Sequence, residues 1–169
     1  MCSQTSIVDF FKICEMLSKE EIERIEKEMA KFPVKSAASI EALKIVQDKQ
    51  RWVSDESLAE IAKILEMSAT ELENVATFYN LIFRKPVGRH VIYVCDSISC
   101  WVMGYENILA HLNKKLGISY GETTDDNRFT LLPIQCLGNC DRAPAMMVDN
   151  DLYNELTTKE VDDILEKYQ

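Results

Sequence analysis

The sequence has few glycines and no glycine motif. Its five glycines stand at positions 88, 104, 117, 121 and 138, too far apart for a G-x-G-x-x-G turn or a Walker A loop. The chain therefore lacks a phosphate-binding loop, and we expect any nucleotide chemistry to belong to a partner. It also lacks a C-x-x-C pair. A thiol–disulfide exchanger usually needs that spacing, so this class is a weak hypothesis.

Basic residues and long apolar runs are scarce as well. The chain has 19 basic against 28 acidic side chains, a net charge of −9. This balance argues against binding to nucleic acid or to an anionic membrane surface, which would repel an acidic protein. No apolar run approaches the roughly 18 residues of a membrane span, and the N-terminus lacks the basic and apolar regions of a secretion signal. We expect a cytoplasmic protein without membrane insertion.

The first half of the chain has the pattern of helices. After a predicted tail over residues 1–15, we expect a four-helix region over residues 16–84. Apolar residues recur at helical spacing in segments 18–32, 37–50, 54–65 and 68–79. Capping boxes begin at Ser18 and Ser68, and Ser54 precedes two acidic residues that favour a helix N-terminus.

The segment from 54 to 83 also resembles a helix-turn-helix, which would suggest DNA binding. Its charge argues against that function, because the segment contains six acidic residues and Lys63 alone before Arg84. A recognition helix without basic residues cannot neutralise phosphates. We therefore predict that these helices pack against a partner or a neighbouring domain.

In the second half, residues 85–169, the apolar residues follow a different spacing. Short β-rich runs occur at 91–94, 129–135 and 145–148, with a fourth strand around Leu152, and helical patterns cover 105–116 and the segment after Thr157. This order predicts a small α/β layer with a thioredoxin-like outline. The fold class is accordingly α+β or α/β, a helical bundle followed by a thioredoxin-like domain.

Cysteine is the informative residue of this half. In a reducing compartment, clustered cysteines more often bind metal or do redox chemistry than form disulfides. Four of the six are paired by spacing, in Cys-x4-Cys and Cys-x3-Cys, and each pair follows a predicted strand. If these strands are neighbours in one sheet, the four sulfurs converge. The four residues are Cys95, Cys100, Cys136 and Cys140.

Spacing alone leaves three interpretations of these thiols open. Structural zinc takes four thiolates in one closed tetrahedron. A 2Fe-2S cluster takes two pairs, one per iron, and unliganded core thiols are the third possibility. Cys14 has the surroundings of a small buried apolar residue, and we expect Cys2 to be a terminal free thiol. Neither His90 nor His111 has a Cys or His at ligand spacing.

The residues around the cysteines give more information than the cysteine spacing alone. Several stretches of sequence carry this information: Pro86-Val87-Gly88-Arg89-His90, Cys95-Asp96-Ser97-Ile98-Ser99-Cys100, Gly121-Glu122-Thr123-Thr124 and Cys136-Leu137-Gly138-Asn139-Cys140-Asp141, followed by Ala143-Pro144-Ala145. Together they strongly resemble the family of the E subunit of respiratory complex I. Upstream, the residues at 37–43 and 75–80 extend the resemblance over nearly the whole chain beyond residue 15.

This resemblance implies a thioredoxin-like 2Fe-2S subunit of NADH:quinone oxidoreductase. It implies that Cys95, Cys100, Cys136 and Cys140 are the four cluster ligands, with no catalytic residue in this chain. It also implies partners: the F subunit, which holds NADH, FMN and a 4Fe-4S cluster, and the G subunit, in the peripheral arm on the cytoplasmic face of the inner membrane. The cluster would exchange single electrons with the FMN.

Two alternatives remain beside this interpretation. One is the small diaphorase subunit of a soluble NAD-linked hydrogenase or formate dehydrogenase. The other, from a different class, is a zinc-stabilised interaction module.

The residues near the thiols suggest how the site is tuned. Ser97, Ser99 and the backbone near Gly138 can donate hydrogen bonds to sulfur, which raises the potential, whereas Asp96 and Asp141 add opposing negative charge. Gly138 is expected in a tight turn. Residues 97–99 are expected in the loop that leads to Cys100, and Pro144 is expected to begin the strand that follows Cys140. Trp101 either shields the site or packs in the core.

Overall fold

The chain divides between Pro86 and Val87 into two units, each with its own hydrophobic core. The computed structural model describes residues 17–168. The predicted tail, with Cys2 and Cys14, lies outside these described residues. Within residues 17–168, none of the helices has the length and apolar character needed to cross a membrane.

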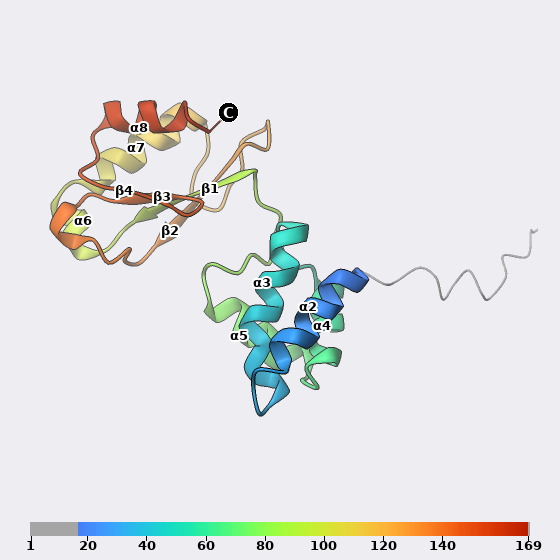
Figure 1. The fold of residues 1–169 in the computed structure, drawn as a ribbon. Helices are drawn as coiled ribbons and strands as arrows, with labels where there is room; N and C mark the ends of the chain where they lie inside the picture. Colours follow the sequence, from blue (N-terminus) through green and yellow to red (C-terminus); the bar gives the residue numbers. More distant parts are fainter. Residues whose placement is uncertain (1–16, 169) are drawn as a thin grey trace, which may run out of the picture. The chain divides into compact units, whose positions relative to one another are not determined.

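The first unit consists of the four predicted α-helices (Figure 1). The serines that were predicted as caps each accept a hydrogen bond from the backbone three residues later, which satisfies an otherwise unpaired N–H group. A short 3-10 helix, Lys35–Ala38, precedes α3 and was not predicted. The helices are α2 (Lys19–Met29), α3 (Ser39–Gln50), α4 (Asp55–Ile64) and α5 (Ala69–Phe78).

Apolar residues from all four helices form the core of this unit. Ile25, Leu43, Ile61 and Leu72, one from each helix, are fully buried. Each lies on the apolar stripe that the sequence pattern predicted, so burial of these stripes is what holds the helices together.

The second unit is a four-stranded sheet with the order β2-β1-β3-β4. The central strand β1 pairs in parallel with β2 and antiparallel with β3, and β3 pairs antiparallel with β4. The parallel pair requires a crossover, which the helices between β1 and β2 provide. The strands are β1 (His90–Cys95), β2 (Phe129–Ile134), β3 (Met146–Val148) and β4 (Asp151–Tyr153).

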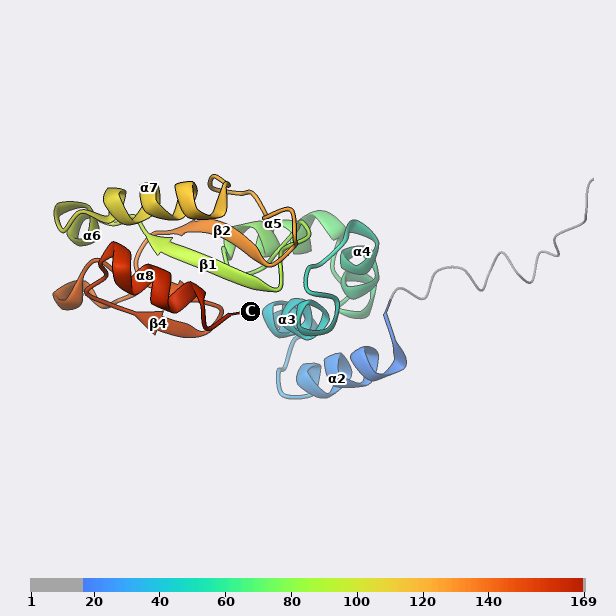
Figure 2. The same cartoon turned by 90° about the horizontal axis from the view of Figure 1, so that it is seen from above.

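Helices α7 (Tyr105–Leu116) and α8 (Thr158–Leu165) cover one face of this sheet (Figures 1 and 2). Alternate residues of the strands, among them Ile92 and Phe129, point into the core beneath these helices, where they meet Leu112 and Val161. This two-layer arrangement is the thioredoxin-like fold that the order of elements predicted.

Two local predictions were wrong. Residues 97–99 were expected to lie in a loop, but the short helix α6 (Ile98–Val102) begins there and carries Cys100. Five residues are too few to show a helical period. Pro144 was expected to begin a strand, whereas β3 begins at Met146, after a cis Ala143–Pro144 peptide bond.

Candidate metal centre

Strand register brings the two cysteine pairs to one end of the sheet. Cys95, the last residue of β1, lies beside Ile134, the last residue of β2, and the two strands run in parallel. The chain therefore leaves both strands in the same direction. Cys100 lies on α6 directly after β1, and Cys140 begins a 3-10 helix, Cys140–Arg142, after β2. In Figure 1, both short helices lie at this end of the sheet.

The first pair is buried. Cys95 and Cys100 have almost no exposed surface, and both thiols are free of disulfides. The Ser97 hydroxyl lies 3.3 Å from the Cys95 sulfur, and the Cys95 thiol also lies 3.6 Å from the Gln135 carbonyl oxygen. This pair is therefore fixed by a strand, a helix and local hydrogen bonds.

Burial and hydrogen bonding have opposite effects on this pair. Burial raises the pKa of Cys95, but hydrogen bonds from the Ser97 side chain and backbone outweigh it, so the net pKa lies below the ordinary value of a thiol. Burial raises the pKa of Cys100 to about 11, with a further contribution from the neighbouring Cys95. The pair thus contains one thiol whose pKa is lowered and one whose pKa is raised.

The second pair is exposed, and its sulfurs are close together. The sulfurs of Cys136 and Cys140 are 3.7 Å apart, and the backbone N–H of Gly138 donates to the Cys136 sulfur over 3.3 Å. The hydrogen bond with Cys136 raises the pKa of Cys140. Gly138 has a φ of +77°, which an L-residue rarely adopts, so the predicted tight turn is present.

The donor set fits two metal ions better than one. Two thiolates on one tetrahedral ion at about 2.3 Å are separated by about 3.8 Å, close to the spacing of the second pair. Charge on Cys95 and on Cys140 contributes to the raised pKa of Cys100, so the two pairs lie near one another. No group of three or more potential ligands within residues 17–168 is arranged to hold a single ion. Two neighbouring pairs of thiols match what a 2Fe-2S centre requires, with one pair for each iron.

The two histidines have other partners. His90 Nδ1 lies 2.7 Å from Asp149, and His111 Nε2 lies 2.9 Å from Asp162. Trp101 is exposed, so it does not pack in the core of its own unit. Both histidines are therefore engaged by carboxylates and not by the four thiols.

Some residues near the thiols were missed from the sequence. The amide of Asn139, between the two exposed cysteines, donates to the side chain of Asn154, and Arg142 forms an ion pair with Glu155 at 2.7 Å. These partners lie 15 and 13 residues apart. No local pattern connects them, and only the return of the chain through β3 and β4 brings them together.

Comparison with known proteins identifies the family of this chain and the cofactor of that family. The family model for the thioredoxin-like [2Fe-2S] ferredoxin matches residues 25–169, which span most of both units. The chain belongs to this family. As a thioredoxin-like [2Fe-2S] ferredoxin it carries one 2Fe-2S cluster, and among the interpretations that spacing left open this favours the iron–sulfur one.

Close relatives of this ferredoxin are named as the E subunit of NADH-quinone oxidoreductase. The protein of that name from Escherichia coli strain K12 is 53% identical over 153 residues, covering 90% of this chain and 92% of the relative. The one from Pseudomonas aeruginosa is 50% identical with the same coverage. The chain therefore also belongs to this family of complex I subunits, as its sequence motifs predicted.

A solved structure with the same fold is the NAD+-reducing [NiFe]-hydrogenase in its H2-reduced state. It aligns with 78% of this chain at a TM-score of 0.67 and 26% identity. The chain spans only 22% of the length of that hydrogenase chain. The similarity therefore concerns one part of a longer chain.

Proposed function

We propose that this chain is the one-electron transfer subunit of an NADH-quinone oxidoreductase, with Cys95, Cys100, Cys136 and Cys140 as the ligands of its 2Fe-2S cluster. The observation that carries this assignment is the parallel register of β1 and β2, because it directs both thiol pairs to one end of the sheet. When bound, a 2Fe-2S cluster accepts or gives one electron at a time.

The chain's own residues hold and tune this centre. Ser97 and the backbone N–H of Gly138 contact sulfurs of the two pairs, and hydrogen bonds to sulfur favour the more negative, reduced state. Burial of Cys95 and Cys100 keeps water from one side of the centre, while the exposed pair leaves the other side open to a partner. This asymmetry suits a centre that exchanges electrons across an interface.

A partner has to supply the nucleotide chemistry. The chain lacks a glycine-rich phosphate loop. We assign NADH and FMN to the neighbouring F subunit, with the G subunit as a further partner, in a peripheral arm on the cytoplasmic face of the inner membrane. The first unit, which has no chemical motif, would provide most of the contact with this flavin-carrying partner.

The exposed apolar surface of α6 supports docking at the thiol end. Ile98, Trp101, Val102 and Met103 are 74%, 54%, 69% and 59% exposed, an unusual density of apolar surface for one short helix and the residue after it. A shallow groove of about 330 Å³ lies between this surface and Cys140. A partner that covers it would bring its redox group close to the cluster.

The ligand assignment is tested by single Cys→Ser variants of the full chain, purified without oxygen. Each of the four proposed ligands should lose iron or change the EPR signal of the reduced protein, whereas Cys2→Ser and Cys14→Ser serve as matched controls. In the assembled complex, Cys136→Ala should also change peroxide production by the flavin. An unchanged 2Fe-2S signal together with unchanged peroxide production in Cys136→Ala would refute the proposal.

A second candidate is the small diaphorase subunit of an NAD-linked hydrogenase. It is favoured by the structural similarity to the NAD+-reducing [NiFe]-hydrogenase. The partner that co-purifies with the chain from its own cell distinguishes the two: quinone-reductase subunits in one case and hydrogenase subunits in the other.

A further inference from the structure

The two cysteine pairs differ in what holds them. Cys95 ends a central strand and Cys100 lies on α6, and both are buried. Cys136 and Cys140 are exposed and lie outside the sheet, in a segment that contains only a single 3-10 turn. Packing of their own side chains therefore contributes little to the position of the second pair. Its geometry depends on contacts that the surrounding loop makes with the rest of the unit.

Residues 154–156, which we call the brace, supply those contacts. The Asn154 side chain accepts a hydrogen bond from the amide of Asn139, the residue directly before Cys140. The Glu155 backbone N–H donates to the Arg142 carbonyl oxygen over 2.8 Å, and the Leu156 N–H donates to the Pro144 carbonyl oxygen over 3.2 Å. The brace thus holds the loop at successive positions from Asn139 to Pro144.

Glu155 is the centre of the brace and has an unusual backbone. Its φ is +51°, a left-handed conformation that is unfavourable for a residue with a side chain. The same residue bonds Arg142 twice, through its N–H and through a carboxylate–guanidinium contact of 2.7 Å. An unfavourable conformation of this kind persists where surrounding contacts fix it, and such positions concentrate at functional sites.

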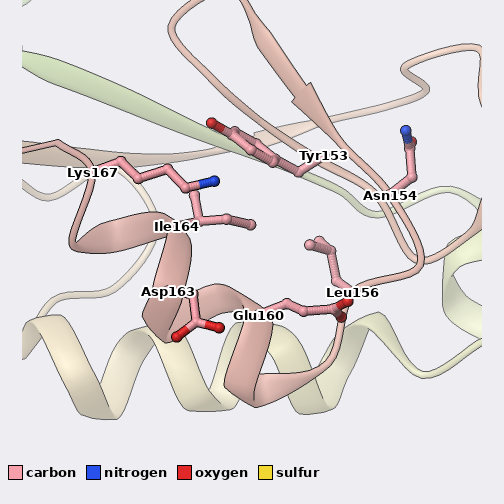
Figure 3. A pocket seen from close by; sticks show the side chains of 7 residues that line it. All are labelled: Tyr153, Asn154, Leu156, Glu160, Asp163, Ile164 and Lys167. Carbon is pink, nitrogen blue, oxygen red and sulfur yellow. The ribbon is translucent and has the colours of Figure 1, made fainter.

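The core anchors the brace from the other side. Leu156 is buried, and Figure 3 shows its side chain and that of Ile164 from α8 directed toward one another. The Asn154 side chain points away from α8 in the same view. The two side chains therefore connect the core beneath α8 with the loop of the exposed thiols.

We propose that the brace positions the Cys136–Cys140 pair, and that it thereby sets both the retention and the reduction potential of the cluster. Asn154 and Glu155 are positioning residues here, since they act on the ligands through Asn139 and Arg142. Contacts behind the ligands commonly orient them and tune the metal. The proposal rests on the ligand assignment above, because it needs Cys136 and Cys140 to bind iron.

The test uses the full chain loaded with its cluster and handled without oxygen. Asn154→Ala removes the amide contact, and Arg142→Glu places like charges together. The double variant Arg142→Glu with Glu155→Arg restores the ion pair in reverse. Asp162→Asn is the matched control, because Asp162 forms an ion pair on the same unit with His111 and Lys115 of α7 instead of with the thiol loop.

The readouts are the rate at which a chelator bleaches the cluster, the EPR signal of the reduced protein, its reduction potential and the thermal unfolding midpoint. Asn154→Ala and Arg142→Glu should each bleach about fivefold faster, the rate equivalent of one ordinary hydrogen bond or ion pair. Both should also shift the EPR signal and the potential. The charge-reversed double variant should recover the bleaching rate, EPR signal and potential of the wild type. Asp162→Asn should change only the thermal unfolding midpoint.

The proposal would be overturned if Asn154→Ala and Arg142→Glu had the same bleaching rate, EPR signal and reduction potential as the wild type. The proposal would also be overturned if Asp162→Asn produced the same changes and if the double variant failed to reverse those of Arg142→Glu, because the effect would then be general destabilisation. Failure of the ligand assignment itself has a separate signature, since Cys136→Ser and Cys140→Ser would then leave the iron content and the EPR signal of the cluster unchanged.

Discussion

Ser97 is the residue whose single hydroxyl has the clearest influence on the thiols. Its oxygen lies 3.3 Å from the Cys95 sulfur, and its hydrogen bonds lower the pKa of that buried thiol despite the burial that raises it. A donor that stabilises a thiolate also stabilises the additional negative charge of a reduced cluster. We therefore expect Ser97 to tune the potential without binding iron.

We predict that Ser97→Ala keeps the cluster and lowers its reduction potential. One hydrogen bond of about 1 kcal/mol corresponds to about 40 mV for a one-electron couple. Redox titration followed by EPR measures the shift. Ser119→Ala is the control, since Ser119 is exposed and lies in a different loop. An equal potential in Ser97→Ala and wild type would contradict this role.

The contacts around the thiols were predictable from the sequence only where the two partners are close together in the chain. Ser97 and Gly138 lie within two residues of Cys95 and Cys136, and their contacts were predicted from that proximity. Asn154 meets Asn139 only because β3 and β4 return the chain to the loop. An asparagine in a polar segment gives no local signal of such a contact.

At the scale of the element, α6 combines a structural and a recognition role. It holds Cys100 inward and presents Ile98 and Val102 to solvent. A loop was predicted there instead of a helix, because five residues do not reveal a helical period.

We predict that Val102→Asp weakens binding of the partner subunit without removing the cluster. Burying a carboxylate at an apolar interface is unfavourable, so the affinity should fall by about tenfold or more. Co-purification and a binding titration measure it. Leu152→Asp on β4 is the control, since Leu152 is also a half-exposed apolar residue. Loss of binding in both variants alike would count against a specific surface on α6.

The two capping boxes of the first unit provide a second comparison between elements. Ser18 and Glu21 cap α2, and Ser68 and Glu71 cap α5, with the same pattern of bonds. Glu21 is buried and also accepts a 3.0 Å hydrogen bond from Gln50, whereas Glu71 is exposed. Both helix starts were predictable from Ser-x-x-Glu. The burial of one of them depends on tertiary packing and was not.

We predict that Glu21→Ala lowers the free energy of unfolding by about 2 kcal/mol, and that Glu71→Ala lowers it by less. Burial raises the pKa of Glu21, but hydrogen bonds from Ser18 outweigh it and the pKa lies below 4.5. The contribution of Glu21 is therefore present above pH 4.5 and lost as the pH falls through its lower pKa in the folded state. Urea unfolding at pH 7 and at acidic pH measures both effects; equal losses at position 21 and position 71 would contradict this account.

At the scale of the whole molecule, the division between Pro86 and Val87 separates the helices of the first unit from all four thiols. The acidity is also unequal, since residues 86–169 carry 13 acidic against 7 basic side chains and a net charge of −6. The spacing of apolar residues and the helix-capping residues were enough to predict four helices and a sheet. The register that brings the thiols together is a long-range property, and the sequence supported it only through strand order and family resemblance.

We predict that a chain lacking residues 1–84 remains coloured but no longer co-purifies with the flavin-carrying partner. The second unit has its own core and all four proposed ligands. The removed part contains the helices that we propose contact the partner. Visible absorbance and co-expression with the partner test the two parts of this prediction. Retained binding would argue that the second unit alone makes the principal contact.

The central claim is that four thiols of this chain hold a one-electron iron–sulfur centre. Purification without oxygen, followed by metal and sulfide analysis and EPR of the reduced protein, tests it most directly. The account predicts a brown protein with a 2Fe-2S signal, about two irons and two acid-labile sulfides per chain. A colourless protein with about one zinc per chain, and no such signal, would contradict it.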